Sequence, residues 1–284
     1  MDPTFDLQPR RGGLPFVRLV TADGATADVY LHGAHVTAWT PAGASEGRLF
    51  LSERAVFDGK AAIRGGVPVV FPQFSDTGPF VRHGFARTAA WTLVRAGRDA
   101  DGAASAVLAL ADTEATRALW PHAFGLRYTV RVSDRMLGLR LDVENTGPAP
   151  FSFTAALHTY LAADGTARVS GLRGLAYRDT TAGGAPRTEH YEAVAVGGSE
   201  IDRVYLAVPG ALKLTDARRT LCLEHEGFAD AVVWNPGREK GAEIGDLLPG
   251  DAARFVCVEA AQVARPVVLG PGAAWTGVQR LVAI

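Results

Sequence analysis

A histidine on an apolar segment is the first candidate for chemistry in this chain. His158 lies in the stretch FSFTAALHTYL, where strand alternation places Thr154, Ala156, His158 and Tyr160 on one face. The small neighbours leave open space beside the imidazole. A strand histidine can also be a satisfied structural residue, but the open face favours a functional one. We therefore predict that His158 is a catalytic acid or base.

A carboxylate interrupts a second apolar segment. Glu259 lies in RFVCVEAA, residues 254–261, which otherwise has the pattern of a buried strand. Burying a carboxylate without a partner is costly and raises its pKa. The alternative interpretation is a structural ion pair with one of the arginines. A His and a Glu whose pKa values both lie nearer neutrality than usual form a matched acid and base, so we predict that Glu259 works with His158.

A third segment, residues 63–87, has the residue types of an anion-binding wall. Gly65 and Gly66 directly follow Arg64, so the backbone there can adopt φ > 0 or approach a ligand closely. Arg64 and Arg87 carry permanently charged planar groups that suit phosphate or carboxylate. The segment therefore predicts one side of a pocket for an anionic substrate. The residues of this wall expected to contact the substrate are Arg64, Arg82, His83 and Arg87.

Two further segments offer groups that suit a sugar. Asp202 and Tyr205, in EIDRVY, could hydrogen-bond sugar hydroxyls, or they could form an Asx turn that leads into the strand VYLAV. Trp234 ends the strand AVVW and offers an aromatic surface. Lys240 could meet a phosphate, although a solvated loop charge is the commoner explanation. We expect Asp202, Trp234 and Lys240 to contact the substrate.

The search for metal and cofactor motifs finds none that is convincing. His32 and His35 are three residues apart, which points them to opposite faces of a strand, and no acidic or Cys ligand directly flanks them. The chain has no GxGxxG or Walker A motif. Cys222 and Cys257 lie in apolar surroundings outside any CxxC pair, which predicts buried free thiols in a reducing compartment. We expect no metal and no organic cofactor.

The charge and hydropathy of the chain argue against nucleic acid and membranes as its partners. The formal net charge is −1 over 284 residues with both signs interspersed, so no long-range field draws the chain to nucleic acid or to an anionic membrane. No apolar run approaches the roughly 18 residues of a membrane span, and the first residues lack an apolar signal segment. We expect a cytoplasmic protein, monomeric or weakly homo-oligomeric, that binds a small molecule.

The elements that must position these side chains are predicted to be strands. The 32 glycines and 16 prolines are spread along the chain, and the stretches between them are short, apolar and β-branched or aromatic. Segments 126–132, 137–143 and 151–161 are predicted to form an antiparallel meander. The expected turns between strands are 99–102, 133–135, 145–148 and 216–219.

A helix is predicted only at residues 112–119, DTEATRAL, with Asp112 as its cap. No repeat, low-complexity tract or long interior linker divides the chain. We therefore predict an all-β protein with few short helices, in which residues 1–284 form a single domain built as a large antiparallel β-sandwich.

Six short motifs in a fixed order carry a resemblance to a known family. They are AIRGGVPVVFPQF from Ala62, HGFAR from His83, LHTYL from Leu157, IDRVY from Ile201, VVWNP from Val232 and VCVEAA from Val256. On these motifs the chain resembles the aldose 1-epimerase (galactose mutarotase-like) superfamily, and within it the hexose 6-phosphate 1-epimerases, over most of its length. Two positions depart from the family pattern. Arg82 stands where relatives often have Gln, and Gly237 stands where the motif usually ends in Trp.

The resemblance implies a β-supersandwich whose open sheet face holds the sugar, with His158 as general acid and Glu259 as general base. It also implies substrate contacts at Arg64, Arg87 and Asp202. The activity implied is interconversion of the α and β anomers of a hexose 6-phosphate, D-glucose 6-phosphate first among them. The alternatives are a mutarotase for an unphosphorylated aldose and a noncatalytic sugar-phosphate-binding β-sandwich, and an acid and base pair argues against the second.

Overall fold

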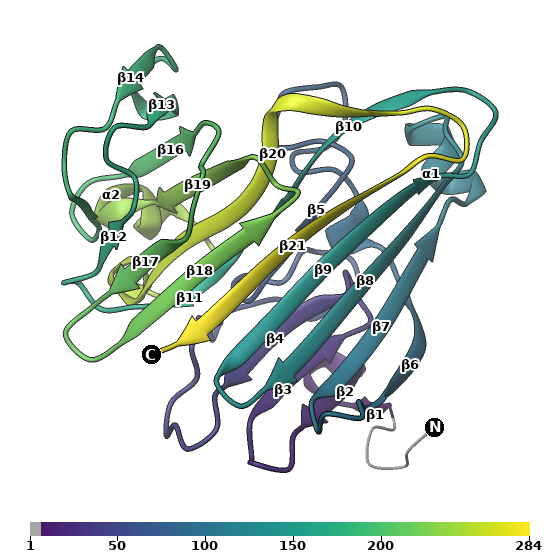
Figure 1. The fold of residues 1–284 in the computed structure, drawn as a ribbon, viewed down its shortest axis with the longest axis horizontal. Coiled ribbons are helices and arrows are strands. Elements are labelled where there is room, and N and C mark those ends of the chain that lie inside the picture. The colour runs from purple at the N-terminus through teal and green to yellow at the C-terminus, as the bar shows by residue number, and fades with distance from the viewer. Residues whose placement is uncertain (1–6) are drawn as a thin grey trace.

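Antiparallel strands dominate the computed structural model, which describes residues 7–284 (Figure 1). The strands form sheets of four, eight and nine members, so the prediction of an all-β antiparallel fold is confirmed. None of the helices formed by the described residues is long and apolar enough to cross a membrane. The predicted domain covers residues 1–284, of which 1–6 lie outside the described residues.

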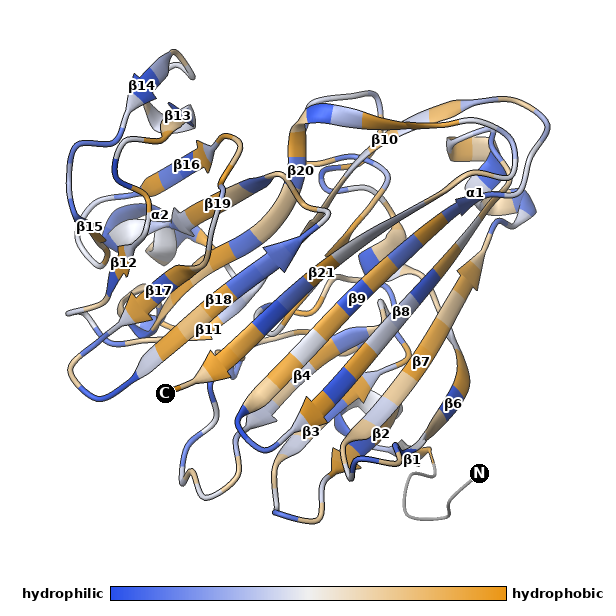
Figure 2. Ribbon diagram, in the orientation of Figure 1, coloured by the Kyte–Doolittle hydropathy of each residue, from blue (hydrophilic) through white to orange (hydrophobic). Residues whose placement is uncertain are grey.

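The nine-stranded sheet forms one layer of the sandwich. Polar and apolar residues alternate along β8 and β9, so each strand has one face in the core (Figure 2). The predicted turns at 99–102, 133–135 and 216–219 each join neighbouring strands of this sheet. In order across the sheet, the strands are β15 (Ala193–Ala195), β12 (Arg168–Ser170), β17 (Leu212–Thr215), β18 (Thr220–Glu226), β21 (Ala274–Ala283), β9 (Met136–Asn145), β8 (Phe124–Ser133), β7 (Ala104–Ala111) and β6 (Thr92–Arg98).

The eight-stranded sheet carries the residues singled out for catalysis. In order, its strands are β14 (Pro186–Thr188), β13 (Ala176–Asp179), β16 (Ile201–Tyr205), β19 (Asp230–Asn235), β20 (Phe255–Leu269), β10 (Phe151–Leu157) and β5 (Val69–Val70), and β11 (Tyr160–Ala162) also pairs with β20. Alternation along β20 sends Val256, Val258 and Ala260 into the main core. Cys257 and Glu259 therefore lie on the opposite, outer face.

A smaller sheet and short helical segments complete the fold. The four-stranded sheet consists of β1 (Gln8–Pro9), β2 (Pro15–Val20), β3 (Thr26–Tyr30) and β4 (His35–Thr40). The α-helices are α1 (Glu114–Leu119) and α2 (Gly237–Glu243), and 3₁₀ turns occur at Arg11–Gly13, Ala86–Thr88, Thr180–Ala182 and Asp251–Arg254.

The structure corrects the helix predictions in two ways. The cap of α1 is Thr113, whose side chain accepts a hydrogen bond from the Thr116 backbone N–H, and not Asp112. Asp112 instead accepts from the Phe124 backbone N–H and pairs with Arg117. The second helix, α2, follows the strand that ends in Trp234 and Asn235, so the segment around Lys240 is helical and not a loop.

The predicted meander of 126–161 is wrong at its third strand. The turn at 145–148 does not fold the chain back onto β9, because β10 pairs with β20 and β5 in the other sheet. The buried side chain of Asn145 fixes this crossover by donating hydrogen bonds to the backbone carbonyls of Ala149 and Leu269, both at 2.9 Å. The hydrogen bonds of this buried amide thus stabilise a crossover between the two sheets at the position where a hairpin was predicted.

The predicted strand 151–161 is also interrupted, at His158 and Thr159. On either side of the break the pairs Leu157–Ala260 and Tyr160–Cys257 keep one continuous register, so His158 stands opposite Glu259. At the break, the His158 backbone N–H donates to the carbonyl of Pro68. His158 is therefore held across the strand from Glu259 without being part of the regular ladder.

Close backbone approach explains the glycines next to Arg64. Gly65 and Gly66 have φ values of 107° and 60°, and a Cβ built on them would lie 2.4 Å from the carbonyl oxygen of Phe50 and 2.2 Å from that of Val36. The sequence predicted that these glycines either adopt φ > 0 or let the backbone approach a ligand. Both have φ > 0, and their close contacts are with the protein's own backbone and not with a ligand site. The glycines fix the path of the chain that presents Arg64.

A buried hydrogen bond links the two large sheets behind the His158 position. The Thr159 hydroxyl donates to Gln279 Oε1 on β21 at 2.6 Å, and Gln279 Nε2 donates to the carbonyl of Val258. Both side chains are almost completely buried. The bond ties the segment that contains His158 to the nine-stranded sheet.

Replacing Thr159 with Val should destabilise the protein. The substitution leaves Gln279 Oε1 buried without a donor, which costs about 1–3 kcal/mol of the free energy of unfolding. Urea denaturation measures the change, and the matched control is Thr92→Val on the edge strand β6, where the exposed side chain should give a change within about 0.5 kcal/mol. Equal stabilities of the two variants would contradict the structural role of this bond.

Candidate active site

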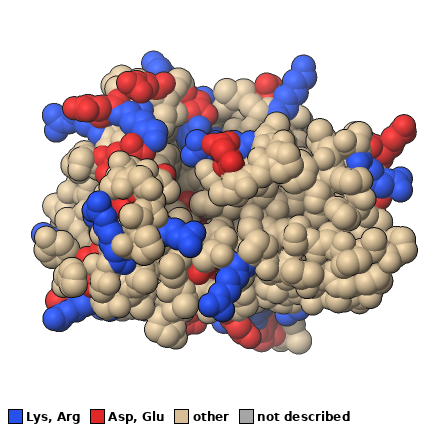
Figure 3. Space-filling model, turned by 90° about the horizontal axis from the view of Figure 1, so that it is seen from above, with Lys and Arg blue, Asp and Glu red and all other residues tan. Residues whose placement is uncertain are grey.

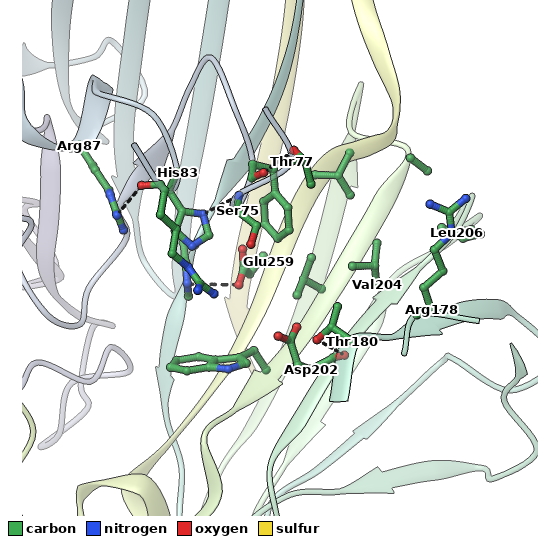
Figure 4. Close-up of a pocket in the computed structure, with 18 of the residues that line it drawn as sticks. Ser75, Thr77, His83, Arg87, Arg178, Thr180, Asp202, Val204, Leu206 and Glu259 are labelled. Atoms are coloured by element: carbon green, nitrogen blue, oxygen red, sulfur yellow. Dashed lines mark hydrogen bonds and ion pairs between the residues drawn. The ribbon is translucent and has the colours of Figure 1, made fainter. Parts of the chain in front are cut away.

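A cavity of about 480 Å³ opens on the outer face of the eight-stranded sheet (Figure 4). β16, β19 and β20 provide its floor, and the segment that contains Arg64, His83 and Arg87 provides one wall. Basic and acidic side chains surround a hollow on this side of the molecule (Figure 3). The volume is in the usual range for a small-ligand pocket. All nine predicted site residues line the cavity: Arg64, Arg82, His83, Arg87, His158, Asp202, Trp234, Lys240 and Glu259.

His158 and Glu259 meet at the bottom of the cavity. The distance from His158 Nδ1 to Glu259 Oε1 is 3.2 Å, and the two residues are 8% and 2% exposed. Burial, followed by the nearby Asp202 carboxylate, raises the pKa of Glu259 well above its ordinary value. Burial, followed by His83 and Arg87, lowers the pKa of His158. The two pKa values are therefore displaced in opposite directions, each towards the uncharged form.

Aromatic rings fix the orientation of the His158 imidazole. The Tyr160 ring stacks on it at 4.9 Å between centroids with an interplanar angle of 11°, and the Trp234 ring meets it edge-on at 5.8 Å. Tyr160 follows His158 by two residues, so the predicted alternation places both on the same face. Ala156 is buried in an apolar cluster with Val70 and Val232.

His83 adds a second imidazole to the same wall. Its backbone has φ of 66°, and its Nδ1 accepts a hydrogen bond from the Ser75 backbone N–H at 3.2 Å. Burial, followed by the charges of Arg87 and Arg82, lowers its pKa to about 3. His83 is therefore neutral with its proton on Nε2, and its ring lies 5.3 Å from that of His158. It is suited to donate a hydrogen bond and unsuited to carry charge.

The arginines of the cavity differ in how they are paired. Arg64 Nε lies 3.0 Å from Asp246 Oδ1, and its Nη1 donates to the Tyr160 hydroxyl. Arg87 donates to the backbone carbonyl of Arg82 and has no carboxylate within ion-pair distance among residues 7–284. Burial lowers the pKa of Arg87. Arg87 is thus a largely buried cation that still lacks an anion.

The rim of the cavity holds two exposed ion pairs. Arg82 Nη1 lies 3.3 Å from Asp76, and Lys240 pairs with Glu200. Exposed pairs of this kind are weak and exchange partners easily. Arg82 and Lys240 are therefore available to a ligand at modest cost.

Asp202 faces the cavity from β16, opposite Trp234 on β19. Burial raises the pKa of Asp202. Tyr205, by contrast, lies on the other face of β16, is 0% exposed and donates its hydroxyl to Glu189 at 2.8 Å. Of the two alternatives left open for Tyr205, the structure supports a structural role and not a sugar contact.

Several cavity residues were not found from the sequence. Arg178 lines the cavity from the β13 hairpin side, and Val204 and Leu206 form an apolar surface along β16 (Figure 4). Alternation from Asp202 predicts the outward position of Val204, but nothing in the sequence places β13 next to β16. The remaining lining residues outside the prediction are Phe74, Ser75, Thr77, Thr180, Gly184, Val232, Ile244, Val263 and Ala264.

The histidine and cysteine predictions have mixed outcomes. His32 and His35 are buried, and each Nε2 lies 2.8 Å from a backbone carbonyl oxygen, consistent with a structural role. Both cysteines are free, but Cys222 is only half-buried. Cys257 is completely buried beside the acid and base pair, and ligand atoms of His158, Cys257 and Glu259 all lie within 4.8 Å of one another. No motif in the sequence indicates this cluster of potential metal ligands.

Comparisons with known proteins agree with this geometry. Residues 15–282 match the protein family described as Aldose 1-epimerase. A Cenchrus ciliaris protein named "Putative glucose-6-phosphate 1-epimerase" is 36% identical over 291 residues, covering 97% of this chain and 86% of that protein. An Escherichia coli protein of the same name is also 36% identical, over 83% of this chain and 79% of its own length.

Solved structures extend the agreement to the fold. A Salmonella typhimurium structure described as a "putative mutarotase" is 28% identical, with a TM-score of 0.90 over 100% of this chain and 94% of its own. A galactose mutarotase-like protein of Clostridium acetobutylicum shares the fold at 16% identity, with a TM-score of 0.80 over 99% of this chain and 98% of its own. With the family match spanning nearly the whole chain, the protein belongs to the aldose 1-epimerase family.

Proposed function

We propose that this protein interconverts the α and β anomers of a hexose 6-phosphate, with D-glucose 6-phosphate as the first candidate. The observation that carries the proposal is the buried pair of His158 and Glu259 at the bottom of a cavity lined by arginines. The family membership and the names of the relatives support the same activity. The cationic wall favours a phosphorylated sugar over a neutral one.

The mechanism uses one acid and one base. Glu259 removes the proton from the C1 hydroxyl while His158 donates a proton to the ring oxygen. The bond between C1 and the ring oxygen breaks as C1 and O1 form a carbonyl. The free aldehyde rotates about the C1–C2 bond, and the ring closes when His158 takes the proton back from the hydroxyl and Glu259 returns its proton to O1. Acid and base are regenerated, so the reaction consumes nothing.

The electrostatics of the pair suit a reversible reaction. The pKa of His158 is lowered and that of Glu259 is raised, so burial favours the uncharged form of each group and brings their proton affinities closer together. Ring opening needs one group to give a proton while the other accepts one. A pair with two protons has no base, and a pair with none has no acid.

The 6-phosphate is proposed to bind at the arginine wall. The carbon that bears the phosphate is attached to the carbon next to the ring oxygen, so a sugar whose ring oxygen faces His158 brings its phosphate close to that histidine. Arg87 and Arg64 both lie near enough to His158 to lower its pKa. Arg87 lacks a carboxylate partner among residues 7–284, so a phosphate would complete its charge pairing.

Removing either member of the pair should abolish most of the activity. His158→Asn and Glu259→Gln should each lower kcat by about 10²- to 10⁴-fold, the usual contribution of a positioned acid or base. The measurement is a coupled assay of anomer interconversion on glucose 6-phosphate, with thermal unfolding to check that the variants remain folded. Near wild-type rates in a folded variant would rule out the assignment.

Removing Arg87 should separate phosphorylated from neutral substrates. Arg87→Ala should raise KM for glucose 6-phosphate by about 10- to 100-fold, the worth of charge-assisted hydrogen bonds, and change KM for glucose far less. Arg140→Ala is the matched control, because Arg140 is exposed on β9 in the other sheet and pairs with Asp142. Arg64→Ala should act in the same direction but also lower stability, because it leaves Asp246 and Tyr160 without their partner. Equal effects of Arg87→Ala on both sugars would refute the phosphate role.

The pH dependence of kcat/KM should show the effect of Asp202 on the pKa of Glu259. Asp202 raises the pKa of Glu259, so it keeps the last proton on the pair to higher pH. Asp202→Asn should therefore move the alkaline limb of the kcat/KM profile to lower pH. The control is Glu200→Gln at the rim, where Glu200 pairs with Lys240 and should leave that limb in place. An unchanged alkaline limb in Asp202→Asn would mean that the limb does not belong to the His158 and Glu259 pair.

A further inference from the structure

Three different metal-ligating side chains meet beneath the cavity. Cys257 and Glu259 are two residues apart on β20 and share its outer face, and His158 stands opposite Glu259. Their ligand atoms lie within 4.8 Å of one another, and the residues are 0%, 2% and 8% exposed in the order Cys257, Glu259 and His158. Within residues 7–284, neither His158 Nδ1 nor Glu259 Oε2 takes part in a hydrogen bond. These buried atoms still have coordination capacity.

The donor set selects a particular class of cation. A thiolate, an imidazole and a carboxylate are the ligands that Zn²⁺ uses, and three protein ligands with a fourth position open to a cavity is the usual arrangement of accessible zinc sites. Mg²⁺ and Ca²⁺ prefer a shell of oxygen atoms, which this cluster does not provide. The chemistry therefore points to a thiophilic divalent cation.

Nearby charges do not prevent a cation from binding. Arg64 and Arg82 each have a carboxylate partner, Asp246 and Asp76 respectively. Asp202 is a further carboxylate that lies close enough to Glu259 to raise its pKa, and its negative charge favours a cation at the cluster. Two ligands of the cluster, Cys257 and Glu259, can each supply a negative charge when ionised. A divalent cation on a thiolate and a carboxylate leaves the buried site with no net charge.

We propose that Zn²⁺ or a similar thiophilic divalent cation binds His158, Cys257 and Glu259 and reversibly inhibits the enzyme. The inhibition rests on the proposed function, because the cation would occupy the lone pairs that the base and the acid need for proton transfer. Cys257 gives up its proton to solvent when the cation binds. The cation enters through the cavity, so a bound sugar phosphate excludes it, and chelation restores activity.

The activity test compares the two cysteines of the chain. Zn²⁺ at buffered free concentrations should inhibit the wild type, and saturating glucose 6-phosphate should protect it. Cys257→Ala should keep its basal activity and need at least about 10-fold more Zn²⁺ for half inhibition, the loss expected for a removed ligand contact. Cys222→Ala is the matched control, because Cys222 lies on β18 in the other sheet and should leave the sensitivity unchanged. Mg²⁺ should not inhibit. Equal Zn²⁺ sensitivity of all three proteins would overturn the proposal.

A binding test does not depend on catalysis. Co²⁺ added to the full-length wild type should bind with one-to-one stoichiometry and give the near-ultraviolet charge-transfer absorption of a thiolate ligand. The band should disappear in Cys257→Ala and persist in Cys222→Ala. Absence of the band in the wild type would overturn the metal site, whatever the activity. A protein that shows the band but does not interconvert anomers would support the site and reject the proposed function.

Discussion

The site depends on the register between β20 and the two strands β10 and β11. The pairs Leu157–Ala260 and Tyr160–Cys257 place His158 directly across from Glu259. Side chains at such opposed positions have Cβ atoms about 4.5–5.5 Å apart, which brings an imidazole and a carboxylate to the observed 3.2 Å. A slip of one residue would turn one partner into the core, because successive side chains point to opposite faces. Strand pairing therefore sets the geometry of the His158 and Glu259 pair.

Burial of this pair is tolerated because the surrounding sheet is rigid and because neither group must remain charged. The inner face of β20 packs Val256, Val258 and Ala260 into the main core, so the strand cannot shift without loss of packing. A separated buried imidazolium and carboxylate would be costly in this environment. The lowered pKa of His158 and the raised pKa of Glu259 both favour the uncharged forms, which avoids that cost.

Alternation along each strand indicates which side chains share a face of the sheet. The sequence does not indicate which strands pair with one another, and much of the site depends on that pairing. The outward faces of His158, Glu259 and Asp202 follow from the period of two and require no tertiary information. The interruption of 151–161 does not follow, because it arises where the His158 backbone N–H bonds to Pro68 in a different part of the chain. Contacts of this kind join residues far apart in sequence, and neither propensity nor hydropathy encodes them.

Contacts between residues distant in sequence also explain why Arg64 and Arg87 look equivalent in the sequence but have different partners in the structure. Arg64 meets Asp246, 182 positions away, whereas Arg87 donates to a backbone carbonyl of its own segment and has no carboxylate partner among residues 7–284. A cation that is largely removed from water without a carboxylate partner is unfavourable for stability, and a folded protein retains such a group most readily where a ligand supplies the missing charge. Arg64 is already neutralised and serves to position Tyr160 beneath His158. Arg87, rather than Arg64, therefore carries a charge that an anionic ligand can still neutralise.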